Sequence, residues 1–194
     1  MGNSLQIATH KLGPRDITDC LDLWVDRMAD GYQDPFLLRN CAAYTPGYCG
    51  RIAEHTGTFT GFAAGHIGTL ASELSIPYNW VADQVNLDST ATIAYADIAC
   101  VKPVFEHRGI GTELLRELTT QLYKHDGVDV IVAEVWEHTA PTAARILEAH
   151  DYEQQYYSDT YWEYATQVGH EPCPACGSTP CDCAGSLYTH DRRH

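Results

Sequence analysis

The chain has few positive charges and lacks long hydrophobic runs. Its 194 residues include only three lysines and nine arginines against 26 acidic residues, so the formal net charge is −14 at pH 7. Because phosphate groups are bound mainly by lysine and arginine, this balance argues against a nucleic-acid partner. No stretch of about 18 apolar residues occurs, so we expect no transmembrane helix and no membrane partner. The N-terminus has no charged-then-apolar signal pattern, so we expect a cytoplasmic protein.

The acidic balance also bears on the protein's environment. Fifteen aspartates and eleven glutamates against three lysines are typical of proteins from a high-salt cytoplasm, where a carboxylate-rich surface stays hydrated. At about 1 M salt the Debye length is only about 3 Å, so the self-repulsion of such a surface is screened. We therefore expect a halophilic protein, with an ordinary acidic protein as the alternative.

The hydrophobic pattern predicts a mixed α/β domain over residues 1–194, a length that suits one full core. Strands are expected over 5–12, 50–56, 58–69, 92–100, 128–136, 151–165 and 184–190. Helices are expected from Asp16 onward and over 34–44, 111–125 and 140–150. Gly57 is predicted to turn a β-hairpin, and residues 70–91 to form a loop or short helix at the surface.

The most informative segment is VKPVFEHRGIGTELL, from Val101 to Leu115, where an apolar strand turns into a helix. Gly109 and Gly111 allow positive φ and a close approach of the backbone to a ligand. The N–H groups and partial positive charge of a helix start then favour an anion, for which pyrophosphate is the obvious biological candidate. The segment lacks the Gly-Lys-Ser/Thr of a Walker loop and the third glycine of a dinucleotide fingerprint. A turn that merely uses glycines is the alternative.

This segment resembles the acetyl-CoA loop of the GNAT superfamily of N-acetyltransferases. In that family a strand ending in Val-x-Pro leads into Arg/Gln-x-x-Gly-x-Gly/Ala and a helix that opens with x-x-Leu-Leu. The resemblance is specific between about residues 92 and 152, and the predicted order β-α-α-β-β-β-α-β-α-β with a final strand extends it over nearly the whole chain. It implies the GNAT fold, a central mixed β-sheet flanked by helices.

The resemblance also implies a cofactor site. The pantetheine arm of acetyl-CoA would bind the strand backbone at Ala99, Cys100 and Val101. The pyrophosphate would lie on the N–H groups of His107, Arg108, Gly109, Ile110, Gly111 and Thr112. Glu106 occupies the loop position where the family has Arg or Gln. A carboxylate there is unfavourable beside phosphates unless it points to solvent or pairs with Arg108.

For catalysis, the family often places a glutamate four residues before the strand-ending valine, and Asp97 holds that position. A carboxylate there can take the proton of an amine nucleophile, directly or through water. A solvent-facing strand residue is the structural alternative. His66, His138 and Tyr95 are weaker candidates, because a lone histidine is more often structural.

The family also often has a tyrosine that protonates the departing thiolate, and here that position holds Leu147. Leucine cannot donate a proton, so another group or water must act, or no acid is needed. A CoA thiol has a pKa near that of cysteine, about 8.5, so its thiolate is a tolerable leaving group.

Four of the eight cysteines fall between residues 173 and 183: Cys173, Cys176, Cys181 and Cys183. A CxxC followed closely by a CxC is typical of a closed, structural Zn²⁺ site. We expect a zinc-binding hairpin at 168–185, between the two final strands, with His170 and His190 as spare ligands. Disulfide or redox roles are the weaker alternative, because no export signal is present. Cys20, Cys41 and Cys49 are predicted to be small apolar residues.

Together these patterns predict an acetyl-CoA-dependent N-acetyltransferase whose amine attacks the thioester directly in a ternary complex. A small-molecule amine, a polyamine and a protein N-terminus all remain open as acceptors, and a homodimer is also open. The alternative is a non-catalytic acyl-CoA-binding or zinc-dependent protein-interaction module, which Glu106 and Leu147 favour. Nucleic-acid binding through the zinc knuckle is disfavoured, since only Arg192 and Arg193 lie nearby.

Overall fold

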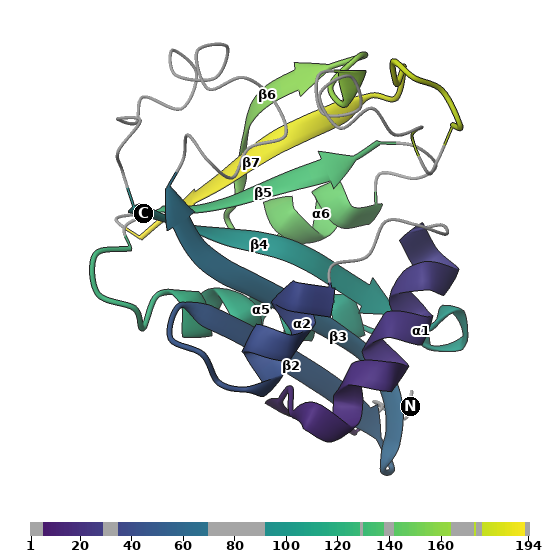
Figure 1. Cartoon of the computed structure of the whole chain (residues 1–194), viewed down its shortest axis with the longest axis vertical. Helices are drawn as coiled ribbons and strands as arrows, with labels where there is room; N and C mark the ends of the chain where they lie inside the picture. Colours follow the sequence, from purple (N-terminus) through teal and green to yellow (C-terminus); the bar gives the residue numbers. More distant parts are fainter. Residues whose placement is uncertain are drawn as a thin grey trace. The chain divides into compact units, whose positions relative to one another are not determined.

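The computed structural model describes residues 6–28, 35–69, 92–128, 130–137, 142–163, 173 and 176–192. Its elements follow the predicted order (Figure 1). The strands are β1 (Ile7–Lys11), β2 (Tyr48–His55), β3 (Thr58–Thr69), β4 (Thr92–Val101), β5 (Val130–Trp136), β6 (Glu153–Ser158) and β7 (Gly185–Asp191). The helices are α1 (Ile17–Met28), α2 (Pro35–Ala42), α5 (Ile110–Leu122) and α6 (Thr142–Glu148), with short 3₁₀ turns at η1 (Pro14–Asp16) and η2 (Pro103–Phe105).

The seven strands form one mixed sheet in the order β1-β2-β3-β4-β5-β7-β6. β4 and β5 are parallel, and this pairing covers only Ala94↔Ile131 and Tyr95↔Val132. The chain divides into two compact units, and the division falls within β3 and β4. Unit 1 comprises Met1–His66 and Asp97–Leu122, and unit 2 comprises Ile67–Ala96 and Tyr123–His194. The mixed α/β fold expected from the sequence is confirmed.

Unit 1 is built around a core that α1, α2 and the strands share. α1 buries one face in this core: Trp24 is buried against Phe62 on β3, with 6.2 Å between the ring centroids, and Leu21 packs against the same core. Cys20 and Cys41 are completely or almost completely buried in this core. Both therefore act as the apolar residues that the sequence predicts.

The hairpin between β2 and β3 also follows from the sequence. His55 pairs with Thr58, so the loop holds only Thr56 and Gly57. Both have positive φ, 50° and 77°, the conformation that suits the right-handed twist of a two-residue hairpin. The predicted turn at Gly57 is confirmed.

In unit 2, β7 lies between β5 and β6 and pairs antiparallel with both (Figure 1). The strand expected over 128–136 is present as β5, in which Ile131 and Val132 are completely buried. The unit's hydrophobic core also takes in three of the clustered cysteines: Cys173, Cys181 and Cys183.

Several boundaries differ from the sequence-based expectation. The strand expected over 151–165 stops at Ser158, because Ser158 Oγ accepts the Thr160 N–H at 3.1 Å and turns the chain. α6 ends before Asp151, whose φ of 61° is incompatible with a continuing helix. The loop expected at 70–91 lies outside the described residues. In the described part of the chain, no helix is long and apolar enough to cross a membrane.

Candidate functional site

In unit 1, β4 leads into α5 through a tight connection. The Lys102 N–H donates to the Thr60 carbonyl on β3 at 2.8 Å, and the chain then turns through Pro103–Phe105. Gly61 fits closely here, because an added Cβ would lie 2.5 Å from the Cys100 carbonyl oxygen. These contacts set the end of β4, and with it the start of the glycine-containing turn.

The turn has the backbone geometry of an anion site. His107 and Gly109 have φ of 57° and 81°, and the Glu113 N–H donates to the Gly109 carbonyl at 3.0 Å as the first bond of α5. The N–H groups of the first helical residues, Ile110 to Thr112, thus have no acceptor within the helix. An added Cβ on Gly109 would meet nothing within 4 Å. The positive φ of this residue, and not a lack of space, therefore explains why glycine stands here.

Glu106, the residue that departs from the family pattern, is paired. Its Oε1 lies 2.7 Å from Nη2 of Arg27 in the last turn of α1. Arg108, which the sequence left open as a partner of Glu106, lies over the Phe105 ring at 5.9 Å from the centroid. The positive charge beside Glu106 thus comes from Arg27, 79 positions earlier, which the sequence analysis did not consider.

Buried and more exposed residues alternate along the strand segment assigned to the cofactor. Ile98 and Cys100 are buried in the core of unit 1, whereas Asp97 and Val101 are half-buried and Ala99 is exposed. Burial raises the pKa of the Cys100 thiol to about 12, which keeps it protonated at neutral pH. Cys100 thus lacks the thiolate that a nucleophile needs.

Asp97 forms a hydrogen-bonded pair with His66 near the end of β3. The Oδ2 of Asp97 lies 2.8 Å from Nδ1 of His66, and the two side chains are 20% and 15% exposed. The His66 ring stacks on Tyr48 of β2, with 5.8 Å between centroids and 19° between planes. The structure therefore brings together a predicted residue and one of the weaker candidates.

Glu134, the one acidic side chain of β5, was not among the residues predicted from the sequence. In unit 2 the hydroxyls of Tyr95 and Tyr161 both donate to its carboxylate, and the Tyr161 bond is 2.7 Å long. Burial and then the Glu134 charge raise the pKa of Tyr161 far above its usual value. A single acid in the otherwise apolar strand VIVAEVW, residues 130–136, is the signal that would have identified it.

Leu147, at the family's tyrosine position, is 6% exposed on α6. Its backbone carbonyl accepts the Tyr152 N–H at 3.1 Å, and its side chain holds no proton to donate. His138, another candidate from the sequence, lies outside the described residues.

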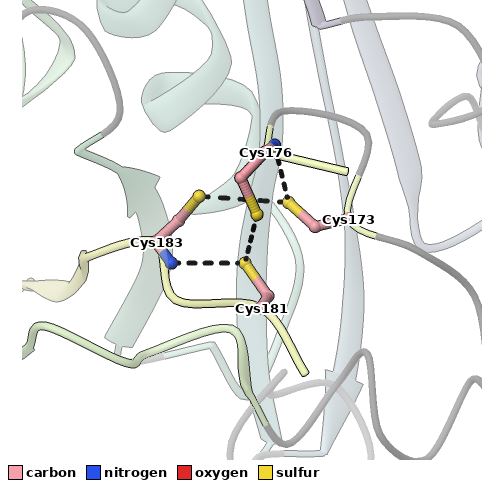
Figure 2. Close-up of side chains that lie close together, drawn as sticks. All are labelled: Cys173, Cys176, Cys181 and Cys183. Atoms are coloured by element: carbon pink, nitrogen blue, oxygen red, sulfur yellow. Dashed lines mark hydrogen bonds between the residues drawn. The ribbon is translucent and has the colours of Figure 1, made fainter. Parts of the chain in front are cut away.

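The four C-terminal cysteines converge in unit 2, with their sulfur atoms directed toward one another (Figure 2). The Sγ atoms of Cys173 and Cys183 are 4.0 Å apart, those of Cys176 and Cys181 3.7 Å, and all four lie within 4.8 Å of one another. Four sulfurs at about 2.3 Å from a tetrahedral Zn²⁺ would be about 3.8 Å apart. None of the four forms a disulfide. The cluster can hold a metal ion.

The backbone around the cluster supports this interpretation. The N–H groups of Cys176 and Cys183 point at the sulfurs of Cys173 and Cys181, at 3.5 and 3.3 Å. Burial raises the pKa values of Cys181 and Cys183, whereas backbone hydrogen bonding at Ser178 lowers the pKa of Cys176 to about 7. A divalent cation would offset the cost of burying thiolates.

Of the two spare histidines, the one that the structure describes is not part of the cluster. His190 instead lies on β7 with its Nδ1 2.6 Å from the Tyr123 hydroxyl, and the cysteine group does not include it. His170 lies outside the described residues.

The fold is similar to those of several solved structures. Arabidopsis thaliana NAA60 in complex with acetyl-CoA has a TM-score of 0.70 and 14% identity, covering 97% of this chain and 100% of that chain. Arabidopsis thaliana Naa50 in complex with the bisubstrate analogue CoA-Ac-MVNAL has a TM-score of 0.63 and 13% identity, covering 95% and 98%. The ribosomal-protein-S18-alanine N-acetyltransferase from Escherichia coli has a TM-score of 0.58 and 15% identity, covering 96% and 94%.

At sequence level, no curated protein matches the chain significantly. Residues 17–152 do match the pattern of the family described as "Acetyltransferase (GNAT) family". This match spans the glycine-containing turn, the Asp97–His66 pair and α6. The chain therefore belongs to the GNAT family of acetyltransferases.

Proposed function

We propose that this protein transfers the acetyl group of acetyl-CoA to a primary amine, by direct attack of the amine in a ternary complex. The observation that carries the proposal is the turn from His107 to Thr112. Two left-handed residues and a helix start expose consecutive backbone N–H groups there, as a pyrophosphate requires. Membership of the GNAT family supports acetyl-CoA as the ligand.

Each part of the cofactor is assigned to residues of unit 1. The pyrophosphate binds the N–H groups of residues 107–112, and the pantetheine arm binds the β4 backbone at Ala99, Cys100 and Val101. The exposed Ala99 leaves room beside this strand. The Arg27–Glu106 ion pair reduces the repulsion that a lone carboxylate would exert on the phosphates.

The proton of the amine leaves through the Asp97–His66 pair. At neutral pH an aliphatic amine is mostly protonated and cannot attack, so a base beside it raises the rate. After attack, the thiolate of CoA departs without a proton from Leu147, which is consistent with the low pKa of a thiol, about 8.5.

A protein N-terminus is the first acceptor to test. The similar structures include an enzyme named for the alanine of ribosomal protein S18 and one bound to a CoA–peptide bisubstrate analogue. A small-molecule amine is the second class of acceptor.

The four cysteines bind one Zn²⁺ in a structural role. Four sulfur ligands close a tetrahedral site and leave no position for substrate, so this metal does not take part in acetyl transfer. We assign the zinc-binding hairpin to residues 168–185 of a single GNAT domain.

The test is release of CoA thiol from acetyl-CoA across a panel of peptides and small amines, at molar salt. We expect amine-dependent thiol release, and loss of CoA binding in Gly111→Val, because a β-branched side chain blocks the approach of the pyrophosphate. CoA binding without thiol release for any amine would contradict the proposal and favour a non-catalytic acyl-CoA-binding module.

A further inference from the structure

The structure assigns different roles to the two members of the Asp97–His66 pair. We infer that His66 accepts the proton of the acceptor amine and that Asp97 is a positioning residue that acts through His66. This inference rests on the proposed acetyl transfer and deepens it, because it identifies which side chain carries the proton. It also revises the expectation, drawn from the sequence, that Asp97 is the base.

The hydrogen bond between the two side chains fixes the protonation of the imidazole. A carboxylate can only accept, so Nδ1 of His66 carries the hydrogen in the 2.8 Å bond to Asp97 Oδ2. In the neutral ring, the lone pair then belongs to Nε2. The pair thus presents a basic nitrogen at the far side of the ring from Asp97.

The ring is held in place by more than the carboxylate. Tyr48 and His66 are paired residues on β2 and β3, and their rings stack nearly parallel at 5.8 Å. Phe36 of α2 meets the Tyr48 ring edge-on at 6.1 Å. A side chain that is 15% exposed and clamped in this way has a defined orientation, as a proton acceptor requires.

The hydrogen bond from His66 favours an ionised Asp97, because a carboxylate accepts this bond. On β2, Cys49 is a thiol whose pKa is raised to about 12 by burial and then by the Asp97 charge. Arg51, on the same strand, forms an ion pair with Glu117 of α5, with 2.8 Å between Arg51 Nη2 and Glu117 Oε2. Asp97 thus faces His66 as a carboxylate and stabilises the imidazolium that forms when the proton arrives.

Imidazole is also the better matched base. An unperturbed histidine side chain has a pKa of about 6.5 and an unperturbed aspartate one of about 3.9, and a general base is most effective when its pKa lies near the working pH. A carboxylate whose pKa lies this far below neutral pH retains little affinity for the proton of an ammonium group. Asp97 is better suited to orient the imidazole and to increase its basicity.

Acetyl transfer by this pair conserves every proton and electron pair. The ammonium R–NH₃⁺ gives one proton to Nε2 of His66, and the amine nitrogen attacks the thioester carbonyl carbon. The new N–C bond forms, the C–S bond breaks, and the electron pair leaves on sulfur. The second amine proton goes to the thiolate, so that N-acetylamine and CoA thiol are the products, and His66 returns its proton to solvent.

The experiment compares the pH dependence of kcat/KM in His66→Gln, Asp97→Asn and a control, His125→Gln, which changes a histidine in the turn after α5. At neutral pH we expect kcat/KM of His66→Gln to fall about 10²–10⁴-fold, and to recover at high pH, where the amine deprotonates without a base. In Asp97→Asn kcat/KM should fall less. The rise of its activity with pH should begin about 1 unit lower, because no carboxylate stabilises the imidazolium. Imidazole in the buffer should partly restore His66→Ala.

A second readout requires no turnover. Long-range ¹H–¹⁵N correlation should show His66 of the wild type protonated at Nδ1 only, with the midpoint of its titration lowered in Asp97→Asn. A loss in Asp97→Asn larger than in His66→Gln, or a His66 protonated at Nε2 alone, would overturn the inference. If the wild type binds CoA but acetylates no amine, the proposed function fails, and the correlation spectrum still decides the geometry of the pair.

Discussion

The guanidinium of Arg27 on α1 lies 2.7 Å from the carboxylate of Glu106 in the loop before α5. Glu106 stands where a cation or amide is usual in the family, and Arg27 compensates for it from a distant part of the sequence. The ion pair is partly exposed, with side chains 38% and 33% accessible, so its effect on stability is small. Its effect on a phosphate bound at this loop, as we propose, should be larger, because the pair sets the net charge of the loop.

Arg27→Ala should therefore weaken CoA binding by about 3- to 10-fold, because it leaves the Glu106 carboxylate beside the phosphates without a partner. The double variant Arg27→Ala/Glu106→Gln should recover most of the affinity. Calorimetric titration with CoA at low and molar salt measures both effects. Equal affinity of Arg27→Ala and wild type at low salt would show that the pair does not influence the phosphates.

Substitutions at two glycines with similar geometry distinguish the effect of the turn before α5 on CoA binding from its effect on stability. Gly109 and Gly57 both have positive φ, and an added Cβ on either meets nothing within 4 Å. Gly109→Val and Gly57→Val should each lower the free energy of unfolding by about 1 kcal/mol or more. Only Gly109→Val should reduce CoA affinity, by at least about tenfold, because the backbone N–H groups of the turn would move away from the pyrophosphate. If both variants bind CoA like the wild type, the turn is not the phosphate site.

Purified protein should contain close to one zinc per chain. Cys176→Ser should lose it, whereas Cys49→Ser, which changes a cysteine outside the cluster, should keep it. The centroids of Trp136 and Trp162 lie 4.8 Å apart, and both rings pack with the cysteines in the core of unit 2. Metal removal should therefore shift tryptophan fluorescence and reduce hydrogen-exchange protection in the C-terminal hairpin. Metal-free protein with all four thiols oxidised would rule out this site.

Removal of the hydroxyl group from Tyr161 can be compared with its removal from Tyr157 as a control. Each donates at 2.7 Å to a carboxylate, Tyr161 to Glu134 and Tyr157 to Asp159, but Tyr161 is 1% exposed and Tyr157 50%. Tyr161→Phe should cost about 1–3 kcal/mol of unfolding free energy, because a partly buried carboxylate loses a charge-assisted hydrogen bond. Tyr157→Phe should cost less than about 0.5 kcal/mol. Denaturant unfolding of both variants measures the difference, and equal losses would show that burial does not strengthen the bond to Glu134.

The sequence predicted those features that local chemistry determines. Gly57 and Gly109 take the backbone conformations that glycine favours, and the spacing of the four cysteines predicted their convergence. The glycine-containing segment after residue 101 also lies between a strand and a helix, as its sequence predicted. Each of these signals lies within a few consecutive residues.

Pairings between distant residues could not be predicted in this way. Arg27 with Glu106, His66 with Asp97 and Tyr161 with Glu134 are each separated by dozens of positions, and no local pattern links them. Their proximity follows from strand order and helix placement, which a single sequence specifies only through the packing of the whole chain.

The most direct test of acetyl transfer is mass spectrometry of amine acceptors incubated with the protein and acetyl-CoA at molar salt. The panel should contain peptides with unblocked and with pre-acetylated N-termini, together with small amines. We predict an acetylated product and one CoA thiol per product for an unblocked amine, both abolished in Gly111→Val. No acetylated product from any amine, with acetyl-CoA left intact, would contradict the proposed transfer.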